Sequence, residues 1–170
     1  HSADSLDVKA ALDDAASRVG SIVALYEKLL VGDAYVEVSV KNYLESVIRS
    51  LVEVYGTGQG VVIDTHIDDF ALSSKNAAPL GIILNELVTN VFKYAFVGRN
   101  EGRVLIALKR ADSCLTLTVK DDGIGFDERV TASKKGGFGT TIVNLLAEQF
   151  DGTYSMDGKH GTTSTVTLYI

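Results

Sequence analysis

The chain has little cysteine, no excess of positive charge and no long apolar run, and each shortage argues against a class of protein. Its one cysteine, Cys114, allows neither an intrachain disulfide nor a zinc site built from cysteines. The formal net charge of −6 argues against a general affinity for nucleic acid or anionic membrane. No stretch of about 18 residues is apolar and uncharged, and no signal-peptide pattern opens the chain. We therefore expect a cytoplasmic protein, or the soluble end of a membrane-anchored one.

The composition is that of a folded globular protein, with 46% hydrophobic and 22% charged residues among 170. Helical and strand patterns are interleaved, yet the strands come largely as adjacent pairs. That order predicts an α+β fold, a two-layer sandwich in which helices cover one face of a mixed, mostly antiparallel sheet.

A heptad pattern occupies the N-terminal part of the chain. Apolar residues recur at spacings of four and three from Val8 to Leu29, which is typical of a helix that packs against another helix. Packing against the rest of this chain is the alternative. The pattern ends at a polar connection over residues 31–39, so we expect residues 1–36 to be separate from a domain at 37–170.

The remaining elements follow from periodicity, caps and breakers. A helix capped by Ser39 should run from Val40 to Tyr55 and end at the glycines of 56–60. A second helix, entered through Asn76 and Pro79 with the proline in its first turn, should run to Phe96. The expected strands cover 61–67, 103–110, 113–121, 152–156 and 163–170. A last helix follows the glycines before residue 140, with Ile142, Val143, Leu145, Leu146 and Phe150 as its apolar set.

Three segments carry chemistry. On the central helix, Glu86, Asn90 and Lys93 share one stripe, which is either a solvated face or an oxygen-rich corner suited to Mg²⁺. Asp121, at a strand end before Gly123 and Gly125, could accept a hydrogen bond from the amine of a base; an ordinary hairpin turn is the alternative. The glycine-rich run 134–141 leads into a helix N-terminus, where a phosphate is favoured; a mobile loop is the alternative.

The order of these segments resembles that of a known family. NELVTNVFKYAF, DDGIGF and GGFGTTIVNLL are similar to the N, G1 and G2 boxes of the histidine-kinase ATP-binding domain, and GTTSTVTL resembles its closing motif. That domain has the Bergerat fold, shared with Hsp90-type, gyrase-type and mismatch-repair ATPases. The finer resemblance is to the HisKA_2 and HWE subgroup, because the lid at 127–136 is short. The segment SRVGSIVALYEKLL resembles the second helix of that subgroup's dimerisation domain.

The resemblance implies ATP and Mg²⁺ as ligands. Asn90 would ligate the metal, Glu86 would be the catalytic base or would orient a reacting group, and Lys93 would meet phosphate. Asp121 would bind the adenine amine with Thr162 beside it. Close approach of backbone to nucleotide would be permitted by Gly123, Gly125, Gly136, Gly137 and Gly139. Lys134 and Lys135, in the lid, could reach the terminal phosphates; a solvated charged loop is the alternative.

The chain departs from the family pattern in its nucleotide-binding motifs, in the N-terminal helix and at the phosphoacceptor. Asp122 stands where asparagine is usual, Ser164 where an aromatic is usual, and Tyr26 where a histidine is common. The acceptor motif of the subgroup is absent, and His1 does not match it.

The implied function is therefore ATP-dependent phosphotransfer to a histidine upstream of residue 1 or in another chain, for relay to a response regulator. The N-terminal helix implies a homodimer. A serine kinase of the anti-sigma-factor type and a non-catalytic nucleotide sensor are the alternatives.

Overall fold

The computed structural model describes residues 16, 20, 23–24, 36–56, 60–126 and 137–170. The heptad helix expected over 8–29 lies outside these residues except at Ala16, Gly20, Val23 and Ala24, which are helical. The lid at 127–136 lies outside them entirely. In the described residues, no helix has the length and apolarity that a bilayer crossing needs.

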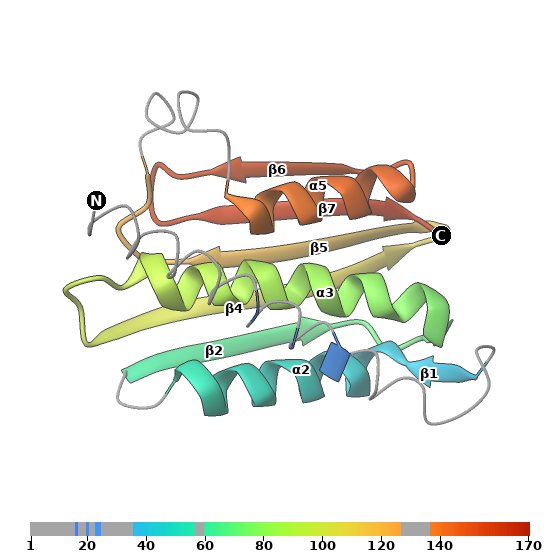
Figure 1. The fold of residues 1–170 in the computed structure, drawn as a ribbon, viewed down its shortest axis with the longest axis horizontal. Coiled ribbons are helices and arrows are strands. Elements are labelled where there is room, and N and C mark those ends of the chain that lie inside the picture. Colours follow the sequence, from blue (N-terminus) through green and yellow to red (C-terminus); the bar gives the residue numbers. More distant parts are fainter. Residues whose placement is uncertain (1–15, 17–19, 21–22, 25–35, 57–59, 127–136) are drawn as a thin grey trace.

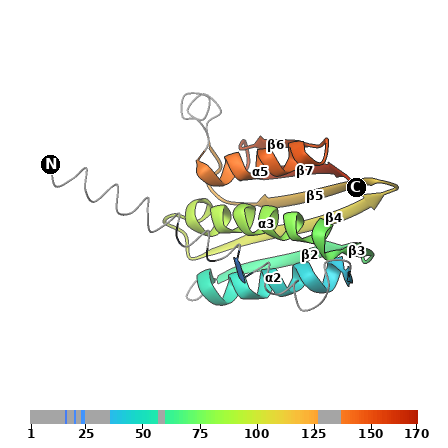
Figure 2. The same ribbon diagram turned by 45° about the vertical axis from the view of Figure 1, so that its right-hand side comes forward.

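Five of the seven described strands form one sheet with helices on one face (Figure 1, Figure 2). Its strands, in spatial order, are β2 (Gly60–Ile67), β4 (Glu101–Ala111), β5 (Cys114–Asp121), β7 (Thr163–Tyr169) and β6 (Thr153–Asp157). β2 runs parallel to β4, and every other pair is antiparallel. The covering helices are α2 (Val40–Tyr55), α3 (Ser74–Asn90) and α5 (Phe138–Gln149). The predicted two-layer α+β architecture is confirmed.

Strict alternation of apolar residues explains the hairpin at the centre of the sheet. Successive side chains of a strand point to opposite faces, so every second residue of β4 and β5 meets the helices. These residues are Val104, Ile106, Leu108, Leu115, Leu117 and Val119, all of them buried. Ile106 pairs with Val119 and Leu108 with Leu117. The predicted hairpin and its core face are confirmed.

Helix α2 begins and ends where its sequence signals lie. The Ser39 side chain accepts the Asn42 N–H at 3.1 Å and caps the helix, which ends at Tyr55 before Gly56. The Ser39 hydroxyl also donates to Asp69 Oδ1 at 2.7 Å. The Tyr55 ring stacks on Phe92 with centroids 6.2 Å apart, which links α2 to the segment after α3.

The start of the central helix differs from the expectation. Helix α3 begins at Ser74, because the Ser73 side chain accepts the Asn76 N–H at 3.4 Å and caps it there. Pro79 thus lies inside the helix, beyond the first turn, and the prediction that it lies in the first turn was wrong. The serine cap upstream outweighs the proline, whose missing N–H removes one intrahelical hydrogen bond. After Asn90 the chain continues as a π-helical segment, η1 (Val91–Ala95).

Two short strands escaped the sequence analysis. β1 (Glu37–Ser39) pairs antiparallel with β3 (Ala71–Ser73), so the end of the expected polar connection at 31–39 is a strand. Strands of this length are too short to show alternation.

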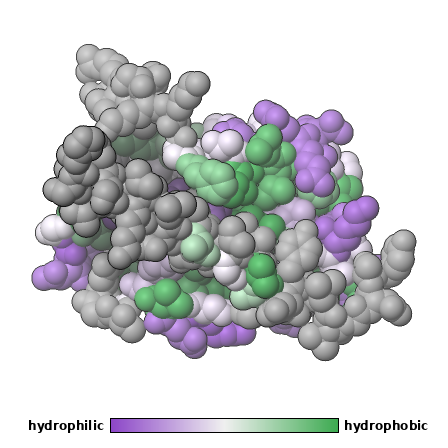
Figure 3. All heavy atoms as spheres, in the orientation of Figure 1, coloured by the Kyte–Doolittle hydropathy of each residue, from purple (hydrophilic) through white to green (hydrophobic). Residues whose placement is uncertain are grey.

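The apolar set predicted for α5 is partly wrong. Val143 and Ala147 are buried, whereas Leu145 is 60% exposed. Figure 3 shows hydrophobic residues at the surface over α5. A helix lying flat on one layer can turn only one side toward it. Ile142, Leu146 and Phe150 pack against the core beside Val143, as predicted, and only Leu145 lies off that side.

Candidate nucleotide-binding site

A cavity of about 910 Å³ lies between the end of α3, the start of α5 and the strands β5, β6 and β7. Helix α3 and η1 supply Leu87, Asn90, Val91, Tyr94 and Ala95 to its wall. Segments far apart in the sequence therefore meet here: the N-terminal half of α5 lies across from the C-terminal half of α3. The candidate residues Asn90, Asp121, Gly125, Gly137, Gly139 and Thr162 all line this cavity.

Asp121 is held at the inner end of the cavity by the backbone around it. It is the last residue of β5, is 2% exposed, and its Oδ1 accepts the N–H groups of Gly123 at 2.9 Å and Thr162 at 3.0 Å. Both hydrogen bonds go to the same oxygen. Within the described residues, Oδ2 has no hydrogen-bond partner and can accept a bond from a ligand.

The segment after Asp121 is packed on both sides rather than exposed as a hairpin turn. Its Ile124 N–H donates to the Ala95 carbonyl at 2.9 Å, and its Phe126 N–H donates to the Gly158 carbonyl at 3.2 Å. A Cβ on Gly123 would lie 2.6 Å from that of Ala95. The hairpin alternative is excluded, since the next described element is α5 and not a strand paired with β5.

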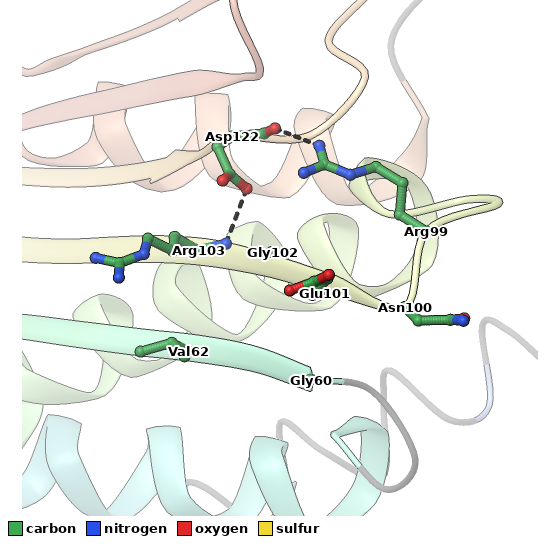
Figure 4. Close-up of a pocket in the computed structure, with 8 residues that line it drawn as sticks. All are labelled: Gly60, Val62, Arg99, Asn100, Glu101, Gly102, Arg103 and Asp122. Atoms are coloured by element: carbon green, nitrogen blue, oxygen red, sulfur yellow. Dashed lines mark hydrogen bonds between the residues drawn. The ribbon is translucent and has the colours of Figure 1, made fainter.

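Asp122 turns away from this cavity into a separate, smaller one of about 540 Å³ (Figure 4). Its Oδ1 accepts the Arg103 N–H at 2.8 Å, and its carbonyl accepts a hydrogen bond from the Arg99 guanidinium. Asp122 therefore ties the turn to β4 and to the segment after η1. An asparagine side-chain oxygen could accept the same Arg103 bond, which explains why either residue suits this position.

The polar stripe of α3 is not a solvated face. Glu86 is only 1% exposed, while Asn90 and Lys93 are half-buried. Asn90 lines the cavity, but Glu86, Lys93 and Gly123 are not among its lining residues. Glu86 Oε1 accepts a hydrogen bond from Asn85 Nδ2 at 3.5 Å. The solvated-face alternative was therefore wrong for Glu86, the most buried of the three.

The glycine-rich entry to α5 forms the opposite wall. Gly137 precedes the helix without a side-chain cap, and Gly139 is buried in the first turn. Thr140, Thr141 and Asn144 continue the wall along α5. Gly136, Lys134 and Lys135 lie outside the described residues.

Several lining residues were missed from the sequence. Leu87 and Val91 belong to the buried core and also line the cavity; with Asn90 and Tyr94 they recur at helical spacing on the side that meets it. Thr141 and Asn144 follow the glycine loop at similar spacing and could have been found in the same way. Met156 and Ser164 could not, because their place in the wall depends on strand pairing.

Comparison with known proteins agrees with this arrangement. Residues 75–170 match the family described as histidine kinase-, DNA gyrase B- and HSP90-like ATPase. The chain belongs to this ATPase family. Within it the domain is of the histidine-kinase type, since residues 1–55 match the HisKA_2 histidine kinase family.

The individual relatives are histidine kinases by name. The chain is 25% identical to blue-light-activated histidine kinase 2 of Erythrobacter litoralis over 141 residues, covering 80% of this chain and 40% of that protein. It is 31% identical over 128 residues to the histidine-protein kinase/phosphatase UhpB of Salmonella typhimurium, covering 74% of this chain and 24% of that protein. It spans 22% of a sensor-like histidine kinase of Chloroflexus aurantiacus. The chain thus spans less than half the length of these relatives.

Solved structures share the fold. The histidine kinase domain of the Erythrobacter litoralis EL346 blue-light-activated kinase superposes with a TM-score of 0.78 at 22% identity, covering 90% of this chain and 73% of that one. The catalytic domain of histidine kinase ThkA gives 0.66 at 13% identity, covering 79% and 95%.

Proposed function

We propose that this chain is the catalytic part of a two-component sensor kinase, which binds Mg²⁺-ATP in the 910 Å³ cavity and transfers the γ-phosphoryl group to a histidine. The observation that carries the proposal is Asp121, which is buried, fixed through one oxygen and left with the other for a ligand. A carboxylate held in this way is suited to an exocyclic amine such as that of adenine. Thr162, whose N–H orients the carboxylate, lies beside the base.

The cavity also fits the rest of the nucleotide. At one side, Gly125 has a φ of +64° and lies against Gly158, so backbone rather than side chain meets the ligand there. At the other, Gly137 and Gly139 open α5, whose free backbone N–H groups and dipole favour phosphate. Gly136, Gly123 and the lid lysines are further candidates carried by the resemblance.

Asn90 would hold the magnesium ion, because it lines the cavity, its side chain carries an amide oxygen, and Mg²⁺ prefers oxygen ligands while keeping several waters. When bound, the ion neutralises charge on the phosphates. Glu86, one helical turn before Asn90, would act as the base or would orient the acceptor imidazole. Lys93, one turn after, would contribute positive charge. Phosphoryl transfer needs mainly such positioning and charge stabilisation.

The acceptor histidine is proposed to lie outside this chain, with a response regulator as the next partner. His66 and His160 are exposed, and neither lines the cavity. Dimerisation through the N-terminal helix and a cytoplasmic setting belong to the same proposal.

The HisKA_2 match over residues 1–55 favours a histidine kinase over an anti-sigma-factor serine kinase. Retention of Glu86, Asn90 and Asp121 together favours a kinase over a non-catalytic sensor.

The test is the affinity of the chain for Mg²⁺-ATP, measured by titration calorimetry for the wild type and Asp121→Asn. The asparagine oxygen can still accept from Gly123 and Thr162, which preserves the turn. Its NH₂ then faces the adenine amine, so donor meets donor. We expect affinity to fall about 10- to 100-fold, as for loss of a hydrogen bond to a charged group.

Asp122→Asn is the matched control, since the same chemical change occurs one residue later and faces away from the cavity. Its affinity should stay within about twofold of the wild type, because surface changes that keep their hydrogen bonds have small effects. Equal affinity of the wild type and Asp121→Asn would remove Asp121 from the site.

A further inference from the structure

The inner floor of the cavity is a row of side chains across three strands. Strand register places Val119 of β5 opposite Ser164 of β7, and Ser164 opposite Met156 of β6. All three line the cavity. Asp121 lies two residues beyond Val119 on the same face of β5, about 7 Å further along. The row therefore forms the part of the wall that a base would meet beyond its contact with Asp121.

Ser164 is the polar member of this row, and it is 6% exposed. Its Oγ lies 3.5 Å from the Tyr154 hydroxyl, which also donates to Met156 Sδ at 3.4 Å. Tyr154 lies two residues before Met156 on the same face of β6, opposite Val166 of β7. Burial raises the pKa of the Tyr154 phenol above its ordinary value, against a smaller opposite effect of Ser164, so the phenol stays protonated at neutral pH.

The hydroxyl of Ser164 retains bonding capacity toward the cavity. A separation of 3.5 Å is at the limit of a hydrogen bond, and a serine hydroxyl has one donor and two acceptor positions. Within the described residues, the phenol is its side-chain partner. A hydroxyl in an otherwise apolar floor is costly to bury without full hydrogen bonding, which a ligand or one water could complete.

We propose that Ser164 is a specificity-determining residue of the nucleotide site, whose hydroxyl bonds a ring nitrogen of the purine beside the amine accepted by Asp121. The bond is direct or passes through one water. This inference rests on the proposed function and deepens it: the preferred base is an aminopurine with that ring nitrogen intact. Purines carry ring nitrogens on both sides of the amine, N1 and N7, and the test distinguishes them.

The experiment is a thermodynamic cycle between the protein and the base. Affinities of Mg²⁺-ATP, Mg²⁺-1-deaza-ATP and Mg²⁺-7-deaza-ATP are measured for the wild type, Ser164→Ala and Ser155→Ala. Ser155 is the matched control, because it is an exposed serine of β6 that does not line the cavity. Ser164→Ala should bind Mg²⁺-ATP about 3- to 10-fold more weakly, as for one lost hydrogen bond.

With the analogue that lacks the contacted nitrogen, Ser164→Ala should cause no further loss, whereas Ser155→Ala should behave as the wild type with all three nucleotides. The inference would be overturned if Ser164→Ala left the Mg²⁺-ATP affinity unchanged. It would also be overturned if Ser164→Ala weakened the binding of both analogues as much as it weakens the binding of Mg²⁺-ATP. Equal melting temperatures of the nucleotide-free proteins exclude unfolding as the cause. If the wild type itself failed to bind Mg²⁺-ATP, the proposed function would fail instead.

Discussion

Gly125 is the residue on which the turn after β5 depends most directly. Its φ of +64° is in the left-handed region, and an added Cβ would collide with the Gly158 carbonyl oxygen. The next residue, Phe126, donates its N–H to that same carbonyl. Backbone geometry and close approach therefore both require glycine here. The consequence is a wall of the cavity made of backbone.

Gly125→Ala should lower the free energy of unfolding more than Gly98→Ala does. Gly98 has a φ of +76° but open space around its Cα, so alanine there incurs only the backbone penalty of about 1–2 kcal/mol. Gly125→Ala adds the collision, and we expect at least about 1 kcal/mol of further loss from the strain. Urea denaturation of the nucleotide-free proteins measures both. Equal losses would show that the contact with Gly158 relaxes freely.

Helix α5 has two sides with different roles. Val143 and Ala147 are buried, whereas Thr141 and Asn144 are exposed residues at the cavity. Leu145 points to neither place and is exposed. The orientation of this one helix therefore decides at once which residues stabilise the fold and which meet a ligand.

Val143→Ala should destabilise the protein by about 2 kcal/mol, because it removes buried methyl groups and leaves a cavity. Leu145→Ala should change stability by less than about 0.5 kcal/mol, as for an exposed position. The pair is a matched comparison on one helix, measured by thermal or urea unfolding. A larger loss for Leu145→Ala would contradict the orientation of α5 described above.

At the scale of the whole molecule, the sheet and helices bring three distant segments to one cavity, and the chemistry proposed there needs a further partner. Asn90 comes from the helical layer, Asp121 from a strand end, and the glycines from the entry to α5. The relatives of this chain are longer proteins, of which it spans less than half. The site can therefore be complete for the nucleotide while the acceptor group lies elsewhere.

We expect this chain, incubated with Mg²⁺ and γ-labelled ATP, to gain no acid-labile phosphate on His1, His66 or His160. Added to the acceptor helix of its own full-length protein, it should produce phosphohistidine there. Asn90→Ala should abolish that transfer, because the proposed magnesium ligand is lost. Acid-labile phosphate on a histidine of this chain would contradict the proposal that the acceptor histidine lies outside it.

Much of the fold follows from local patterns. The alternation from Val104 to Val119 predicts the central hairpin and its buried face, and Ser39 predicts the start of α2. Alternation and capping can be recognised in the sequence because they depend only on residues that are close together along the chain. The start of α3 was misplaced because two local signals, the cap at Ser73 and the proline at 79, competed. The short strands β1 and β3 form by pairing with each other, and neither segment carries a strand pattern of its own that would predict this pairing.

The sequence by itself determined which chemical groups are present and in what order: Asn90 on a helix, Asp121 after a strand, and glycines before a second helix. Only the tertiary structure decided where each group points. It turned Asp121 into the cavity and Asp122 out of it, and it placed Ser164 in the floor through pairing with Val119 and Met156. The reason is physical: a carboxylate's neighbours in space come from strands and helices that folding brings together, and no local pattern records them.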